Sequence, residues 1–93
     1  MAAVAGIRQA HATLVAATVD TVTMSGGLHK RAELVNHGTD VIYFRLDGTD
    51  PVVAADENEV LLGSERLAIS LPSDGVVKVI SAGTPTYSVI VTG

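Results

Sequence analysis

Hydrophobic and polar residues alternate in short runs along most of this chain. In residues 41–47 one face carries Ile42, Phe44 and Leu46, while the other carries Tyr43, Arg45 and Asp47. A period of two is typical of a β-strand that is buried on one side. Turn-forming residues separate such runs at close to the spacing found in β-sandwiches and barrels. We therefore predict strands, in chain order, over residues 12–17, 21–24, 31–36, 41–47, 60–62, 66–71, 76–82 and 86–92.

Other runs add detail to this pattern. Residues 66–71 place Leu67, Ile69 and Leu71 on one face, and residues 86–92 place Tyr87, Val89 and Val91 on one face. Residues 76–82 carry apolar side chains on both faces, as expected of a central strand or of one covered by another subunit. The sequence HGTD at 37–40 joins two predicted strands, so we expect a hairpin there with Gly38 at a positive φ.

The composition favours a single all-β domain. Val, Ile and Thr make up 28 of the 93 residues, and these β-branched side chains favour strands over helices. We predict a small antiparallel β-sandwich or barrel of about 7–8 strands over residues 12–93. Residues 1–11 are rich in alanine and show no clear period, so we assign them to an extended amino-terminal arm or a disordered segment.

Size and hydropathy indicate association with other chains. A domain of 93 residues without cysteine has no disulfide to stabilise it and buries only about 60% of the surface that its unfolded chain exposes. Its apolar content of 47% and mean hydropathy of +0.40 are high for this size, so we expect a partner to cover part of the surface. The amino terminus lacks the pattern of a signal peptide and no apolar run is long enough to span a bilayer, so we expect no membrane partner.

Charge and aromatic content disfavour nucleic-acid binding. Residues 46–93 hold two basic residues against seven acidic ones, the opposite of the balance expected of a protein that binds a phosphate backbone. The chain has only three aromatic residues on which bases or sugars can stack. We therefore expect no nucleic-acid partner.

The sequence contains no recognised catalytic motif. The three histidines, His11, His29 and His37, lie far apart, no cysteine is present, and neither GxSxG nor the phosphate loop GxxxxGK[ST] occurs. The acidic stretch 48–59 has carboxylates that suit calcium, but it does not follow the EF-hand order. Solvated acids on a surface loop are the commoner arrangement. We expect no enzyme activity and no cofactor, and we assign no metal ligands.

The sequence DGTDP at 47–51 raises a choice between an ion site, an acid/base pair and a turn. Asp47 suits the start of a turn because its carboxylate can accept a hydrogen bond from the backbone two residues on. Gly48 tolerates a positive φ, and Pro51, which follows Asp50, ends a strand ladder because it has no N–H to donate. We therefore expect Asp47 and Asp50 to form a turn, with a calcium site as the alternative.

Three stretches together resemble a known class of proteins. They are ELVNHGTDVIYFRLDGTDPV at 33–52, VLLGSERLAISLP at 60–72 and VVKVISAGTPTYSVIV at 76–91. Their sequence pattern is similar to that of small β-rich structural proteins of tailed bacteriophages, most of all capsid decoration (cement) proteins. The resemblance covers about residues 13–92. The positions that match are Asn36, Tyr43, Asp47, Gly48, Pro51, Gly83 and Tyr87.

The resemblance implies a virion protein that binds the outer surface of the capsid and stabilises the shell without catalysis. Its partner is then the major capsid protein, its own assembly a homo-oligomer with a trimer favoured, and its location the capsid surface after synthesis in the host cytoplasm. We expect contacts with partners at Ile7, Arg8, Tyr43, Arg45 and Tyr87. Turn geometry is expected at Asn36, Gly38, Asp47, Gly48, Asp50, Pro51 and Gly83. A phage tail or head-to-tail connector protein and a virion-surface adhesion module are the alternatives.

Overall fold

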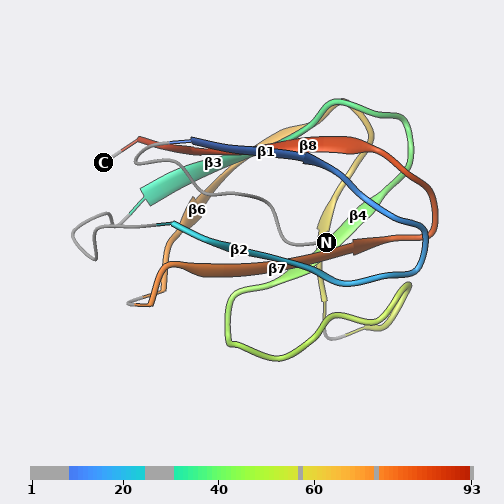
Figure 1. Ribbon diagram of the computed structural model, residues 1–93, viewed down its shortest axis with the longest axis horizontal. Helices are drawn as coiled ribbons and strands as arrows, with labels where there is room; N and C mark the ends of the chain where they lie inside the picture. Colours follow the sequence, from blue (N-terminus) through green and yellow to red (C-terminus); the bar gives the residue numbers. More distant parts are fainter. Residues whose placement is uncertain (1–8, 25–30, 57, 73, 93) are drawn as a thin grey trace.

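The computed structural model describes residues 9–24, 31–56, 58–72 and 74–92, and within them every regular element is a strand (Figure 1). The strands are β1 (Gln9–Thr13), β2 (Asp20–Thr23), β3 (Arg31–Asn36), β4 (Ile42–Arg45), β5 (Glu59–Leu61), β6 (Arg66–Ser70), β7 (Val76–Ser81) and β8 (Thr86–Val91). The predicted all-β class is therefore confirmed. No helix in the described part of the chain has the length and hydrophobicity needed to cross a membrane.

The strands form two antiparallel sheets that pack face to face as a β-sandwich. The first sheet has the order β1-β8-β3-β6 and the second has the order β2-β7-β4-β5. Figure 1 shows β1 and β8 in one layer above β2 and β7 in the other. The strand β7, which has apolar side chains on both faces, lies between β2 and β4, so the prediction of a central strand is confirmed.

The core lies between the two sheets and uses the side chains that alternate inward. Ile42 and Phe44 of β4 are fully buried, as are Tyr87 and Val89 of β8, which confirms the alternation predicted for both strands. Along β6, Ile69 is buried, whereas Leu67 and Leu71 are only partly buried against the core. The edge of the sandwich at β6 is therefore less completely covered than its centre.

Most connections cross from one sheet to the other. Among the strands that the structure describes, only β4 and β5 are consecutive in the same sheet, and they pair antiparallel across the long loop 46–58. The predicted hairpin at 37–40 is wrong, because β3 and β4 belong to different sheets. Strand β3 already has β8 on one side and β6 on the other, so no edge remains for β4.

The first strand begins earlier than the sequence pattern predicted. It spans Gln9–Thr13 instead of residues 12–17, with Ala10 and Ala12 directed inward and paired with β8. Alanine is small enough that its alternation with polar neighbours gives a weak apolar signal. After Thr13 the chain leaves the ladder: Leu14 donates to the Pro85 carbonyl at 2.9 Å, and Ala17 takes a positive φ of 55°. Of the predicted arm, residues 9–11 belong to β1, and the rest lies outside the described residues.

Candidate functional site

The stretch after β4 forms a tight turn built on one aspartate. The backbone N–H of Thr49 donates to Asp47 Oδ1 at 3.0 Å, and Gly48 between them has a φ of +82°. This is the side-chain turn that the sequence predicted, with glycine in the left-handed conformation that disfavours other residues. Asp47 and Gly48 are therefore confirmed as turn-forming residues.

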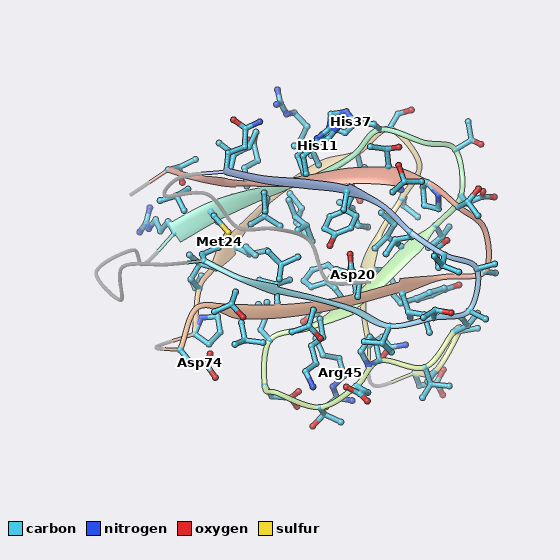
Figure 2. All side chains as sticks on the ribbon, viewed as in Figure 1. His11, Asp20, Met24, His37, Arg45 and Asp74 are labelled. Carbon is cyan, nitrogen blue, oxygen red and sulfur yellow. The ribbon has the colours of Figure 1, made fainter. Side chains whose placement is uncertain are left out.

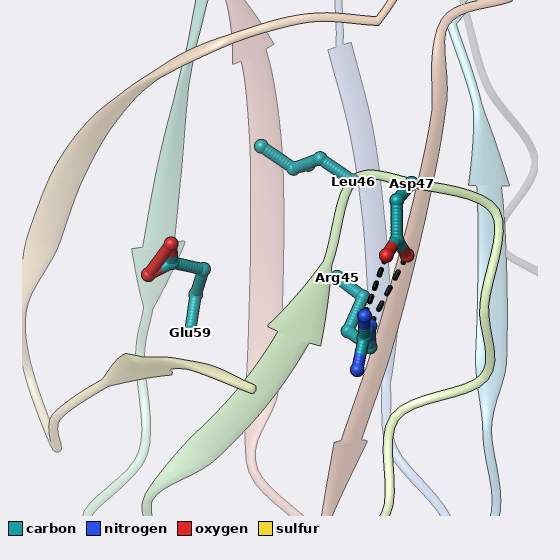
Figure 3. Close-up of a pocket in the computed structure, with 4 residues that line it drawn as sticks. All are labelled: Arg45, Leu46, Asp47 and Glu59. Carbon is teal, nitrogen blue, oxygen red and sulfur yellow. Dashed lines mark hydrogen bonds and ion pairs between the residues drawn. The ribbon is translucent and has the colours of Figure 1, made fainter. Parts of the chain in front are cut away.

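Asp47 also pairs with Arg45, two residues earlier. The guanidinium donates from Nε to Oδ1 at 3.1 Å and from Nη2 to Oδ2 at 2.5 Å (Figure 3). This two-point contact is the main cause that holds the pKa of Asp47 well below its usual range, and the hydrogen bond from the Thr49 N–H is the second. A carboxyl group that stays ionised is a poor proton donor or acceptor at neutral pH, so the turn is not arranged for acid/base catalysis.

The second acid of DGTDP reaches the neighbouring strand. Asp50 Oδ1 accepts from Lys78 Nζ of β7 at 2.8 Å, and Pro51 beside it is fully buried. Arg45 and Lys78 are directly opposite each other on β4 and β7, so the two acids pair with two adjacent bases on the outer face of this sheet. The start of the loop 46–58, through Pro51, therefore folds back onto the sheet.

A shallow pocket of about 300 Å³ lies beside this turn. Arg45, Leu46, Asp47 and Glu59 line it, and Figure 3 shows Glu59 across the end of β4 from the Arg45–Asp47 pair. Among the described residues no three side chains of His, Asp or Glu lie close enough to hold a metal ion. The calcium alternative thus gains no support from the described part of the acidic loop.

Two of the histidines come together, which the sequence did not predict. His11 of β1 and His37, just after β3, both reach the hydroxyl of Ser88 on β8. Figure 2 shows the two histidines close together, and their ring centroids are 5.4 Å apart. His11 Nδ1 is 2.5 Å from Ser88 Oγ and His37 Nε2 is 2.8 Å from it. Strand β8 lies between β1 and β3, and this order brings the two rings together.

The chemistry open to this cluster is limited by its geometry. Ser88 is only 2% exposed, and both ring nitrogens that face it already bond its hydroxyl. A nucleophilic serine has to reach a substrate, and two imidazoles are fewer ligands than a zinc site uses. We therefore interpret His11, Ser88 and His37 as a structural hydrogen-bonded cluster that links β1, β8 and β3.

Tyr87, predicted as a contact residue, lies in the core. Its side chain is fully buried and its hydroxyl donates to Asp20 Oδ2 of the opposite sheet at 2.8 Å. Figure 2 shows Asp20 pointing into the space between the two sheets. Tyr87 offers no surface to a partner, so this interface prediction is corrected. Its role is packing.

The predicted turn residues Asn36 and Gly38 organise the crossing from β3 to β4. Asn36 is buried and donates from Nδ2 to the carbonyls of Asp40 at 2.7 Å and Leu62 at 3.1 Å, while its Oδ1 accepts from the Gly38 N–H at 2.9 Å. Gly38 does not have the positive φ that was predicted. It is close to Pro85 instead, since a Cβ on Gly38 would lie 2.7 Å from the Pro85 Cβ.

Gly83 also serves close packing. A Cβ added there would collide with the carboxylate of Asp40, and the Gly83 N–H donates to Ser81 Oγ at 3.2 Å. Asp50 and Pro51 lie at the start of the loop 46–58, where Pro51 contributes a buried ring in addition to ending the strand. These contacts link distant segments, so they are not visible in the local sequence.

The remaining predicted contact residues differ in their positions. Tyr43 and Arg45 lie on the outer face of β4 and are partly exposed, and Tyr43 is directly opposite the exposed Val60 of β5. Ile7 and Arg8 fall outside the described residues. Large apolar side chains at 44% to 62% exposure occur at Val60 and Leu62 on and just after β5, at Val52 in the loop before it, and at Val15 after β1.

Comparison with known proteins finds no family model that matches the chain and no curated protein with significant similarity to it. The class of protein that the structure defines is therefore a small all-β sandwich of two four-stranded antiparallel sheets.

Proposed function

We propose that this chain is a non-enzymatic structural protein of a virion that binds the outer capsid surface and stabilises the shell. The resemblance of the stretches at 33–52, 60–72 and 76–91 to capsid decoration proteins suggests this role. The single structural observation that supports it is the group of apolar side chains exposed on and next to the edge strand β5. A small domain gains most from covering such a group with a partner.

The group contains Val60 and Leu62, with side chains 44% and 54% exposed. The loop residue Val52 is linked to the start of β5, because its carbonyl accepts a hydrogen bond from the side chain of Asn58, the residue before that strand. Tyr43 extends the group across the outer face to β4, through its pairing with Val60. We propose that these residues contact the major capsid protein. The resemblance favours a trimer as the form that binds the capsid, and sedimentation of the purified protein distinguishes a trimer from a dimer.

Two measurements test the role in the particle. In the intact particle, electron microscopy should find the protein in many copies on the capsid surface, and particles without it should be less resistant to heat or chelators. A few copies at the tail would contradict the proposal and favour the tail or connector alternative. Binding to cells or glycans by the purified protein would favour the adhesion module.

Surface variants test the contact residues. Val60→Asp and Leu62→Asp should abolish rebinding to particles that lack the protein, because a charge placed in an apolar interface is left without water or a partner. Val15→Asp is a matched control, since Val15 is 54% exposed but follows β1, an edge strand of the other sheet. Equal binding by all three variants would contradict the proposed surface.

The amino-terminal segment is tested separately. A truncation of residues 1–8 leaves β1 intact because that strand begins at Gln9. If the segment acts as an arm, the truncated protein should bind particles more weakly while its thermal unfolding is unchanged. Unchanged binding would show that the segment is dispensable.

A further inference from the structure

The strand β6 is an edge strand whose outer backbone groups have no strand beside them in the described chain. It pairs only with β3, in the register Leu34 with Leu67 and Ala32 with Ile69. The Asn36 N–H donates to the Glu65 carbonyl at 2.9 Å. Hydrogen-bonded pairs alternate along an antiparallel ladder, so Leu67 and Ile69 bond to β3. The N–H and C=O groups of Arg66, Ala68 and Ser70 then point away from the sheet.

The core beneath this edge is open. A groove of about 270 Å³ runs between the sheets there, lined by Phe44, Leu46, Glu59, Leu67, Ala68, Ile69 and Ser70. Leu67 stays partly exposed on its wall, and Leu71, which follows β6, is also only partly buried against the core. A strand added beside β6 would satisfy the free backbone groups and place its own inward side chains over these leucines.

The opposite edge of the same sheet gives a useful contrast. Strand β1 also has no strand beside its outer edge among the described residues, but its inward residues Ala10 and Ala12 are already buried, at 2% and 9% exposure. A strand added beside β1 would gain backbone hydrogen bonds without covering apolar surface. The edge at β6 is therefore the one where an added strand also completes the core.

We propose that β6 pairs antiparallel with β6 of a second copy of this chain, about a two-fold axis at Ala68. This register pairs the three residues of each copy whose backbone groups point out from the sheet edge, with Ala68 opposite Ala68 and Arg66 opposite Ser70. On the inner side, Leu67 of one copy lies opposite Ile69 of the other, so the apolar walls of the two grooves meet, with Glu59 of each copy at the side of the groove away from β6. The pairing brings no two like charges directly opposite each other.

The sequence of the strand favours a second copy over an unrelated partner. RLAIS contains no proline and its single charge is at one end, so β6 lacks the usual features that keep edge strands apart. The strand is complementary to a second copy of itself, because in the two-fold register the same residues of both copies form the contact. The pairing joins two four-stranded sheets into one continuous sheet, and it does not depend on the proposed role in a virion.

Charge substitutions at Ser70 test the pairing in the purified protein. Ser70→Glu places a carboxylate opposite the partner's Arg66 and should tighten the dimer, whereas Ser70→Lys places a like charge there and should loosen it, each by about tenfold in dissociation constant. If only the overall charge of −4 mattered, the two affinities would be in the opposite order, because Glu adds to the repulsion between copies and Lys reduces it. Gln9→Lys and Gln9→Glu on β1 are matched controls.

Sedimentation measured over a range of concentrations gives the association state of each variant. The wild type should form a dimer, Ser70→Glu a tighter one and Ser70→Lys a weaker one. The dimer affinity of the Gln9 variants should change only as net charge predicts, with Gln9→Glu weaker and Gln9→Lys tighter. A monomeric wild type, a trimer unaffected by either Ser70 substitution, or the reverse order of affinities would overturn the proposal.

Cross-linking gives a second test that does not depend on charge. The chain has no cysteine, so Ala68→Cys introduces the only thiol, and the proposed axis places it opposite its own copy within the Cα separation that a disulfide spans. Mild oxidation should convert this variant to a covalent dimer, while Gln9→Cys stays monomeric under the same conditions. Equal cross-linking of both variants would overturn the two-fold pairing at β6.

Discussion

The hydroxyl of Tyr87 on β8 donates to the carboxylate of Asp20 on β2 at 2.8 Å, across the interior of the sandwich. Tyr87 is fully buried and Asp20 is 4% exposed, and the other carboxylate oxygen, Oδ1, has no partner in the described part of the chain. Tyr87→Phe would leave a buried carboxylate without this donor. We expect it to lower the free energy of unfolding by about 3 kcal/mol in urea denaturation.

A double-mutant cycle separates the hydrogen bond from the packing of the ring. Removing both polar groups, as in Tyr87→Phe with Asp20→Val, should recover part of the stability lost in Tyr87→Phe alone, because no unsatisfied carboxylate then remains. Additive losses in the cycle would show that the two groups do not stabilise each other.

The same pair predicts a dependence of stability on alkaline pH. Burial, together with the hydrogen bond to the Asp20 carboxylate, raises the pKa of Tyr87 above its usual value of 10.0. A pKa that is higher in the folded state stabilises the fold fully below the unfolded value, and this contribution is lost as the pH rises above it. The loss is about 1.4 kcal/mol per pH unit.

Urea denaturation from about pH 9 to pH 11 measures this slope. The wild type should lose stability more steeply than Tyr87→Phe above about pH 10, since the variant has no phenol to ionise at this position. Parallel curves for the two proteins would contradict the prediction.

The turn after β4 predicts a shift in an exposed carboxyl group. The pKa of Asp47 is lowered first by the Arg45 guanidinium and then by the Thr49 N–H, so Arg45→Met should raise it part of the way back toward 3.8. A lowered pKa stabilises the fold above the unfolded value and loses that contribution as the pH falls below it. Because Asp47 is solvent-exposed, the effect is best followed by NMR titration of its carboxyl carbon. Lys78→Met, which removes the neighbouring base paired with Asp50, should leave this titration unchanged.

The strands that sequence alone predicted well are those with large apolar side chains in alternation. Ile42 and Phe44 mark β4 clearly, whereas β1 depends on Ala10 and Ala12, which are too small to give a strong apolar signal. The crossing at 37–40 was not predictable locally, because it follows from the pairing of β3 with β6 and β8 far along the chain.

The candidate sites show the same division. The turn at Asp47 rests on contacts within four residues and was predicted. The burial of Tyr87 had a signal, since its alternation with Val89 and Val91 already placed it on an apolar face. The meeting of His11 with His37 had none, because it depends on β8 lying between β1 and β3.

Two glycines separate the effect of backbone conformation from that of close packing. Gly48 has a φ of +82° with open space around it, so Gly48→Ala should cost about 1 kcal/mol through conformation alone. A Cβ on Gly63 would lie 2.5 Å from the carbonyl oxygen of Thr39, so Gly63→Ala should cost more, about 2 to 3 kcal/mol. Gly48→Asn should recover most of its loss, because asparagine tolerates this conformation, whereas Gly63→Asn should not. Equal losses at the two positions would contradict this distinction.

The hydrogen-bonded cluster around Ser88 predicts that His11 and His37 adopt the same neutral tautomer. The serine has one hydroxyl proton, so it donates to one ring nitrogen and accepts from the other. If His11 Nδ1 carries the proton, His37 Nε2 must accept, and both rings are then protonated on Nδ1. If His37 Nε2 carries it, His11 Nδ1 must accept, and both rings are protonated on Nε2.

Nitrogen NMR of the two rings identifies the tautomers directly. Wild-type protein with both rings neutral should show matching tautomers, and Ser88→Ala, which removes the shared hydroxyl, should let each ring adopt its own preference. Different tautomers in the wild type would mean that Ser88 accepts from both rings or from neither. The tautomer of one histidine would then not be set by that of the other through the hydroxyl of Ser88.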